Sequence, residues 1–266
     1  MSLVKKYSNL KKIIKKYDSA VVAFSGGVDS AFLAKITHNL LKNKAYAVTV
    51  DAAVFPEEEI NDAKKIAEEI GIAHSVITVD DLMNAIADNP PDRCYYCKKK
   101  IFSTIKEKTK SSVIFDGTNS DDIKEHRPGK KAISELNVVS PLKEAGFSKK
   151  DIRDLAKDIG LSIWNKNSYT CLATRVSYDE KISKEALDMV KKAEKSLSKL
   201  KFKNLRVRHH GKLARIEVTP SQRDKLYDKK LMDKIYKSLR NIGYKYVTMD
   251  LKGYRTGSMD ETVDNK

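Results

Sequence analysis

The first half of the chain alternates between short apolar runs and longer amphipathic runs, and few folds accept that alternation. The apolar runs have the length of buried strands and occupy residues 19–24, 45–51, 73–80 and 112–117. The runs between them have helical spacing, and residues 56–71 open on Pro56 and acidic residues and close on Gly71, as helices do. Because helical crossovers connect parallel strands, the pattern predicts an α/β fold built on a doubly wound parallel sheet.

The pattern changes near Ser183. It predicts a helix over 183–200, strands over 205–210 and 214–219, helices within 221–241, and a last strand over 244–251. This order indicates a smaller C-terminal α+β domain of the ferredoxin-like kind with an antiparallel sheet. The expected domains are therefore residues 1–178 and residues 179–266.

The hydropathy of the chain argues against a membrane protein. No apolar run approaches the roughly 20 residues that span a bilayer, and residues 1–20 are basic and amphipathic without the core of a signal peptide. We expect a cytoplasmic protein. The formal net charge of +16 permits a polyanionic partner such as RNA, but lysines scattered along helices more often form a solvated surface.

The segment SGGVDS stands between the first expected strand and a helix-like run. At that place in a doubly wound sheet, glycines let the backbone approach a phosphate, and the helix N-terminus adds N–H groups. The segment matches the SGGxDS pattern of the PP-loop, which binds ATP for attack at the α-phosphate, and it lacks the GxxxxGK[ST] pattern that serves β,γ cleavage. Asp29 would hold Mg²⁺ or brace the turn, and the plain alternative is an ordinary Gly-Gly turn. The residues assigned to ATP binding here are Ser25, Gly26, Gly27, Val28, Asp29 and Ser30.

A second polar turn ends the fourth expected strand, at the same edge of the sheet. It contains Gly117, Thr118 and Asn119, with Asp122 shortly after. Its position beside the first loop favours contacts with the adenylate or Mg²⁺, although Asp and Asn are also ordinary turn residues. Asp51 ends the second strand, where it either contacts the ribose or caps the next helix.

Three cysteines make an odd number for a disulfide framework, and their placement is more informative than their number. Cys94 and Cys97 form a CxxC, and Cys171 lies far downstream. Three thiolates can hold a 4Fe–4S cluster with one iron open, or a zinc ion with a borrowed ligand. The same three residues would also fit a redox relay, or they would be unrelated thiols.

Four further segments resemble a single family. They are FDGTNSDD at 115–122, RPG at 127–129, SYTCLATR at 168–175 and VRHHGKLARIEV at 207–218. Together with SGGVDS, they make the chain similar to the LarE family of sulfur transferases, in the PP-loop ATP-pyrophosphatase superfamily. The resemblance extends to GYRTGSM near the C-terminus, and the sequence departs from the family's CLASR-x-PYG at Thr174, Ser177 and Asp179.

The resemblance implies a reaction. Family members use ATP and Mg²⁺ to adenylate a carboxylate of a pyridinium dicarboxylate mononucleotide and convert it to a thiocarboxylate for the nickel-pincer nucleotide cofactor. In single-cysteine members the residue matching Cys171 gives up its own sulfur, whereas members with an added CxxC hold a 4Fe–4S cluster on three cysteines. This sequence matches the second type, with Cys94, Cys97 and Cys171 as ligands and a sulfide or a sulfur-donor protein as source. Arg175 would steer the anionic substrate, and a homo-oligomer is expected.

Arg206 and Arg208 lie two residues apart on one expected strand, so they point to the same face. They would clamp a substrate phosphate or be surface charge, and the resemblance favours the clamp. Glu217, on the neighbouring strand, would face them as a partner or as a metal ligand.

Two other functions fit the same residues. One is a cluster-dependent tRNA thiolase of the PP-loop superfamily, which the positive charge would suit, although no RNA-binding signature such as that of an RRM is present. The other is a non-catalytic, zinc-stabilised nucleotide-binding module, which would bind ATP without releasing pyrophosphate.

Overall fold

The computed structural model describes residues 1–124, 128–167, 169–178, 180–200, 202, 204–255 and 257–262. The chain divides into two units, one of Met1–Ala85 with Asp92–Tyr169, and one of Ile86–Pro91 with Thr170–Lys266. Arg127, Ser168 and Asp179 of the sequence motifs lie outside the described residues.

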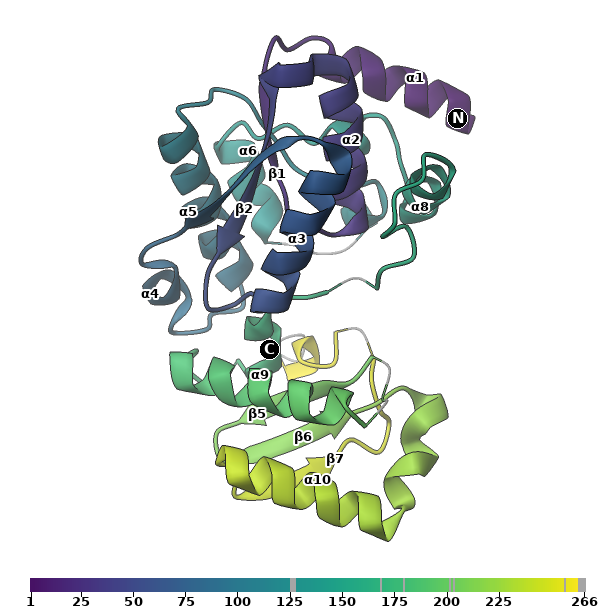
Figure 1. The fold of residues 1–266 in the computed structure, drawn as a ribbon. Helices are drawn as coiled ribbons and strands as arrows, with labels where there is room; N and C mark the ends of the chain where they lie inside the picture. The colour runs from purple at the N-terminus through teal and green to yellow at the C-terminus, as the bar shows by residue number, and fades with distance from the viewer. Residues whose placement is uncertain are drawn as a thin grey trace. The chain divides into compact units, whose positions relative to one another are not determined.

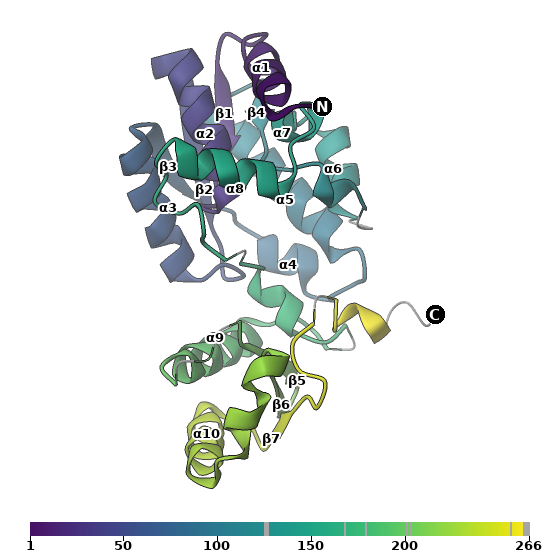
Figure 2. The same ribbon diagram turned by 90° about the vertical axis from the view of Figure 1, so that its right-hand side faces the viewer.

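The first unit is built on a parallel sheet in the order β3-β2-β1-β4 (β1 and β2 are labelled in Figure 1, and all four strands in Figure 2). Its strands are β1 (Ala20–Ala23), β2 (Ala45–Asp51), β3 (Ala73–Thr78) and β4 (Ile114–Phe115). The chain runs outward from β1 to β3 and then returns to add β4 on the other side of β1. This reversal between β1 and β4 is the topological switch point of a doubly wound sheet, and it confirms the predicted α/β fold.

Helices cover both faces of this sheet. Successive residues of each strand point to opposite faces, and the strands are apolar on both, so both faces are buried under helices. The helices up to residue 158 are α1 (Leu3–Ile14), α2 (Val28–Leu41), α3 (Glu57–Ile70), α4 (Leu82–Ile86), α5 (Arg93–Thr109), α6 (Gly129–Glu135), α7 (Pro141–Glu144) and α8 (Lys149–Asp158). On one face Val22 and Ala47 share a buried cluster with α1, α2, α3 and α8. Helix α5 lies on the other side of the sheet (Figure 1). There Val21 and Val48 pack with Phe102 of α5.

Helix α5 begins at Arg93. Pro90 and Pro91 precede it, and proline is well tolerated just before or at a helix start because it lacks an N–H group. The first turns of α5 therefore contain the CxxC of Cys94 and Cys97.

The second unit has a three-stranded sheet in the order β5-β6-β7, with its two long helices on one face (Figure 2). Its elements are α9 (Lys184–Ser198), β5 (Arg206–His210), β6 (Leu213–Glu217), α10 (Lys229–Ile242) and β7 (Tyr246–Met249). Val207, Ala214 and Leu239 belong to its buried core. This α-β-β-α-β order repeats the last five elements of a ferredoxin-like β-α-β-β-α-β domain.

The wholly antiparallel sheet predicted for this unit is wrong. β5 and β6 are antiparallel, but β7 runs parallel to β6. The chain passes from β6 to β7 through α10, and a helical crossover returns a strand in the same direction as the one it left. Among the described residues of either unit, no helix has the length and apolar character needed to cross a bilayer.

A short segment from the first half of the chain belongs to the second unit. Asn89 is fully buried with φ +51°, and its amide donates to the carbonyls of Ser177 at 2.6 Å and Glu180 at 3.0 Å. Asparagine tolerates this left-handed conformation better than most residues do. These bonds tie residues 86–91 to the loop that precedes α9.

Candidate active site

The SGGVDS loop leaves the end of β1 and enters α2 as a tight turn. Gly26 has φ +70°, and a Cβ on it would lie 2.8 Å from the Cα of Ala63 in α3, so only glycine fits without moving that backbone. Gly27 is the N-cap of α2 and supplies no side chain to its first N–H groups. The helix therefore begins with backbone donors that can bind an anion.

Two serine hydroxyls close this turn. The Oγ atoms of Ser25 and Ser30 lie 3.1 Å apart, and the Ser30 hydroxyl donates to Gly27 O at 3.1 Å. Ser30 is buried, whereas Ser25 is exposed. Ser30 therefore braces the loop from inside, and Ser25 presents its hydroxyl at the surface.

The turn after β4 lies against the SGGVDS loop. A Cβ on Gly117 would lie 3.1 Å from the amide nitrogen of Ser30, so the two backbones approach closely. Asn119 Nδ2 donates to Asp29 at 3.1 Å, and the Asn119 N–H donates to Asp122 at 3.2 Å. The switch point thus brings together the two segments that the sequence placed at one edge of the sheet.

Asp29 has an electrostatic environment that favours a cation nearby. Burial raises its pKa, the hydrogen bond from Asn119 partly opposes this, and the charge of Asp122 raises the pKa further. Asp122 in turn pairs with Lys149 at 3.3 Å. A divalent cation next to Asp29 would stabilise the carboxylate and reverse the shift. The carboxylate oxygens of Asp29 and Asp122 are of the kind that Mg²⁺ prefers as ligands.

Asp116 braces the second turn. Its carboxylate accepts from the Ser140 hydroxyl at 2.6 Å and from both the hydroxyl and, at 3.4 Å, the N–H of Thr118. The hydroxyl of Thr118, a residue of the turn predicted to contact the adenylate or Mg²⁺, is therefore directed to Asp116 in this structure.

A cavity of about 310 Å³ opens at the junction of the two loops, a volume within the range of small-molecule sites. The predicted residues that line it are Ser25, Gly27, Val28, Asp29, Ser30, Gly117, Thr118 and Asp122. Of the other predicted residues, Gly26 packs on α3, Asn119 is buried, and Asp51 is exposed at the end of β2. Four basic side chains also line the cavity and were not singled out from the sequence: Lys98, Lys149, Arg153 and Lys166.

Two of these basic residues connect the cavity to a loop far along the chain. Lys166 pairs with Glu59 and Asp62 of α3, each at 2.9 Å. Arg153 donates to the carbonyls of Trp164 at 2.9 Å and Lys166 at 2.7 Å. No motif marks them, because each looks in the sequence like an ordinary surface charge on a helix or turn.

The three cysteines are divided between the units. Cys94 and Cys97, three residues apart near the start of α5, lie on one side of that helix, and Cys171 precedes the short turn Leu172–Arg175 of the second unit. Cys94, Cys97 and Cys171 form no disulfide. Thiolates suit iron or zinc in chemistry, but each unit by itself holds only part of the set. Within the described residues no three His, Cys, Asp or Glu side chains are grouped as metal ligands.

Arg175 holds the backbone around Cys171. The side chain is fully buried, and its Nη1 donates to the carbonyls of Thr170 at 2.8 Å and Cys171 at 3.1 Å. Its Nε and Nη2 donate to Glu194 at 3.0 and 3.2 Å. These contacts fix the backbone around Cys171, and no sequence motif marked Glu194 as a partner of Arg175.

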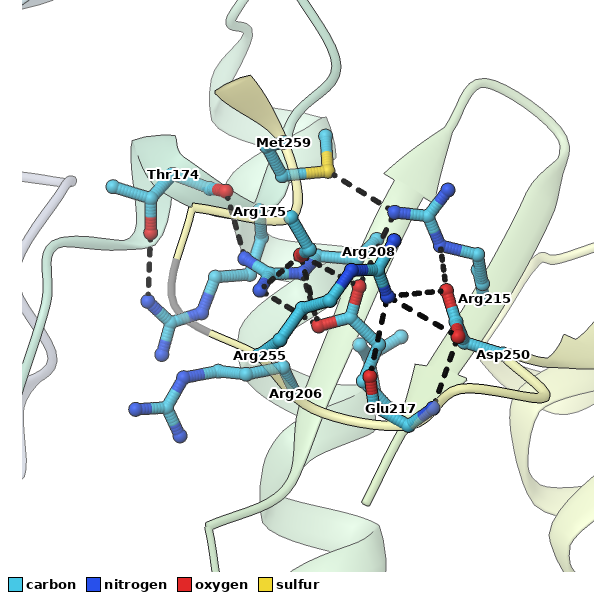
Figure 3. A network of polar contacts seen from close by, with 12 residues as sticks. Thr174, Arg175, Arg206, Arg208, Arg215, Glu217, Asp250, Arg255 and Met259 are labelled. Carbon is cyan, nitrogen blue, oxygen red and sulfur yellow. Dashed lines mark hydrogen bonds and ion pairs between the residues drawn. The ribbon is translucent and has the colours of Figure 1, made fainter. Parts of the chain in front are cut away.

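Arg208 and Glu217 form a buried ion pair (Figure 3). Arg208 donates to Glu217 from Nε at 2.9 Å and from Nη2 at 2.7 Å, to Ser258 at 3.0 Å, and from Nη1 to Thr174 O at 3.0 Å. Glu217 also accepts from Arg215 at 3.2 Å. Most of the guanidinium hydrogens of Arg208 are therefore used inside the protein.

Arg206, on the same face of β5, is held differently. Its Nη1 donates to Leu205 O at 2.8 Å, and its guanidinium lies 5.2 Å from the ring centroid of Tyr254. Figure 3 shows it pointing away from the Glu217 carboxylate. Burial lowers the pKa of Arg206, and the positive charge of Arg175 adds to this effect. An anion beside Arg206 would stabilise its positive charge and oppose both effects on its pKa.

Comparisons with known proteins bear on both units. Residues 3–113 match the family model described as NAD synthase. A protein of Synechocystis described as uncharacterized is 35% identical over 265 residues, which cover 98% of this chain and 99% of that protein. The pyridinium-3,5-bisthiocarboxylic acid mononucleotide synthase of Lactiplantibacillus plantarum is 34% identical over 267 residues, covering 98% of this chain and 96% of that protein. The chain belongs to the LarE family.

Family membership confirms the resemblance inferred from the motifs. The NAD synthase match contains the SGGVDS loop and ends just before β4, so this LarE-family protein is an enzyme of the PP-loop ATP-pyrophosphatase family. The NH3-dependent NAD+ synthetase of Methanococcoides burtonii is 34% identical over 76 residues, which cover 28% of this chain and 29% of that protein. The similarity to NAD synthases is thus confined to part of the chain, whereas the similarity to the mononucleotide synthase covers nearly all of it.

Gly26→Ala should weaken ATP binding by this LarE-family protein and lower its free energy of unfolding, because the added Cβ meets the α3 backbone. Gly146→Ala is the matched control, since Gly146 has φ +77° and nothing within 4 Å of its would-be Cβ. We expect Gly26→Ala to cost about 1–3 kcal/mol more than the control, the usual cost of overpacking, in urea unfolding. Equal effects of the two substitutions on stability and on calorimetric ATP affinity would contradict the close packing of the loop on α3.

Proposed function

We propose that this protein is an ATP-dependent sulfur transferase that converts a carboxylate of a pyridinium dicarboxylate mononucleotide to a thiocarboxylate for the nickel-pincer nucleotide cofactor. One observation carries the proposal. A PP-loop cavity lies at the switch point of a chain that is 34% identical, over 98% of its length, to a pyridinium-3,5-bisthiocarboxylic acid mononucleotide synthase.

Adenylation would be the first step. A carboxylate oxygen of the substrate attacks the α-phosphorus of ATP, the bond from that phosphorus to the α,β-bridging oxygen breaks, and pyrophosphate leaves. The N–H groups at the start of α2, with Lys149 and Arg153 in the same cavity, would stabilise the charge that develops on pyrophosphate. Asp29 would hold Mg²⁺, which when bound shields the phosphate oxygens from the incoming carboxylate.

Sulfur would enter in the second step. A sulfur nucleophile attacks the carbonyl carbon of the acyl adenylate, and AMP leaves with the bonding electrons. Cys94, Cys97 and Cys171 would hold a 4Fe–4S cluster, which when bound supplies a sulfide on its open iron. Arg175 contributes by fixing the backbone of Cys171.

The second unit would bind the phosphate of the substrate. Among the described residues, the Arg206 guanidinium donates to one acceptor, Leu205 O. Because a guanidinium has five N–H donors, others are left to bind an anion. Arg208 would donate the remaining hydrogen of its Nη1 atom to the same phosphate, and Glu217 would hold the Arg208 guanidinium in place. We also propose a homo-oligomer, as the resemblance to the family implies.

Arg206→Ala should weaken binding of the substrate mononucleotide by about ten- to a hundredfold, because a charge-assisted hydrogen bond contributes about 1.5–3 kcal/mol. Its affinity for ATP and its free energy of unfolding should change little. Arg208→Ala is the comparison variant and should lower the free energy of unfolding by about 3 kcal/mol, because Glu217 stays buried with less compensation. Calorimetric titration and urea unfolding measure these effects. Normal substrate affinity in Arg206→Ala would show that Arg206 does not bind the substrate. Weakened ATP affinity in this variant would contradict the assignment of ATP to the first unit and of the substrate phosphate to the second.

Serine substitutions of Cys94, Cys97 and Cys171, made one at a time, should each abolish iron binding and sulfur transfer, because three thiolates are needed to leave one iron open. Anaerobically purified protein is analysed for iron, zinc and acid-labile sulfide, with visible absorbance as a second readout. ATP affinity is the control and should survive in all three variants.

Three outcomes would contradict the cluster assignment. Zinc in place of iron would favour the zinc-stabilised module. Dispensable Cys94 and Cys97, with Cys171 found by mass spectrometry as dehydroalanine after turnover, would favour the sacrificial single-cysteine reaction. Wild-type protein that takes up no iron on anaerobic reconstitution would leave the three thiols without a common role.

A further inference from the structure

A chain of polar groups lies beneath the PP-loop, and the loop motif does not include it. Thr49 of β2 is buried, and its hydroxyl lies 2.7 Å from the carbonyl oxygen of Phe24 and 2.8 Å from Nε2 of His74 in β3. Phe24 immediately precedes Ser25, the first residue of the loop. Side chains of the neighbouring strands β2 and β3 are therefore connected to the peptide that opens the loop after β1.

The direction of these hydrogen bonds follows from the chemistry of the groups. A carbonyl oxygen only accepts, so the Thr49 hydroxyl donates its one hydrogen to Phe24 O. The bond to His74 then requires Nε2 of the ring to carry a hydrogen and donate it to Thr49. Burial lowers the pKa of His74, and the charge of Lys64 adds to this, so the ring is neutral at pH 7 with its hydrogen on Nε2. Each bond in such a chain polarises and strengthens the next.

The peptide between Phe24 and Ser25 is held at both ends. Its carbonyl accepts from Thr49, and its N–H donates to Ser30 Oγ at 3.3 Å. The N–H of Phe24 is fixed in turn by Val48 O at 2.8 Å. A rotation of this peptide would break the bonds to Thr49 and Ser30 together, and it would displace the Ser25 hydroxyl and the backbone donors that follow.

We propose that Thr49 and His74 are positioning residues for the PP-loop, which set the orientation of the Phe24–Ser25 peptide and thereby place the loop donors against the phosphates of ATP. Neither is among the residues that line the cavity, so both act through the backbone. The effect on pyrophosphate release rests on the proposed function, whereas the effect on ATP affinity requires the nucleotide site alone.

Thr49→Val tests this proposal, because it removes the hydroxyl at nearly constant volume. We expect ATP affinity to fall about three- to tenfold, as for one lost hydrogen bond, and kcat for pyrophosphate release to fall about ten- to a hundredfold, as for misplaced donors. Thr49→Ser keeps the hydroxyl and should restore both values to near those of the wild type. If Thr49→Val only lowers the unfolding temperature, with kcat and ATP affinity per folded molecule equal to those of Thr49→Ser, the proposal is wrong.

His74 provides a second pair of variants should Thr49→Val fail to fold. His74→Phe removes the donor and should lower kcat more than it lowers ATP affinity, whereas His74→Gln offers an amide hydrogen and should recover part of the loss. Equal kcat in the two variants would overturn the role of His74. If the wild-type protein releases no pyrophosphate at all, the proposed function fails, and calorimetric ATP affinity of the same variants still decides whether Thr49 and His74 position the loop.

Discussion

The close approach of two backbones at the switch point of the sheet is the constraint on which the candidate site depends. Gly117 passes so near the Ser30 amide that a side chain at that position would crowd it, and Gly26 presses in the same way on α3. The first contact exists because β4, which precedes Gly117, is a neighbour of β1, and the second because β2, which leads into α3, is its other neighbour. The uncapped start of α2 and the carboxylate of Asp29 therefore face one cavity, where basic side chains from later segments complete the surroundings of a polyphosphate.

In the second unit, several charged side chains are buried on one face of a small sheet. Glu217 is fully buried and accepts from Arg208, Arg215 and Ser258, so its desolvation is offset by three donors. That arrangement uses most of the donors of Arg208 and leaves Arg206, whose charge is partly desolvated, turned away from the carboxylate. The two arginines look equivalent in the sequence, and their surroundings make them different.

Strong local signals predicted much of this molecule. Alternating apolar and amphipathic runs placed the strands of the first sheet and most of its helices, and SGGVDS with the turn at Gly117 marked the edge where the cavity lies. The sequence patterns did not predict features that depend on contacts between residues far apart in the sequence. Asn89 joins the second unit through bonds to Ser177 and Glu180, Lys166 reaches the cavity through Glu59 and Asp62, and β7 runs parallel because α10 intervenes. Thr49 and His74 belong to ordinary strand patterns, and only the register of β2 against β3 brings them together.

The central claim is that the PP-loop directs cleavage of ATP between its α- and β-phosphates. Phosphorus NMR of a reaction containing the protein, ATP, Mg²⁺ and the pyridinium dicarboxylate mononucleotide tests it directly, with Asp29→Ala as the variant that should keep its fold and lose the reaction. We expect the wild-type protein to form pyrophosphate, matched in amount by the acyl adenylate and AMP together. ADP and inorganic phosphate as the products would contradict it.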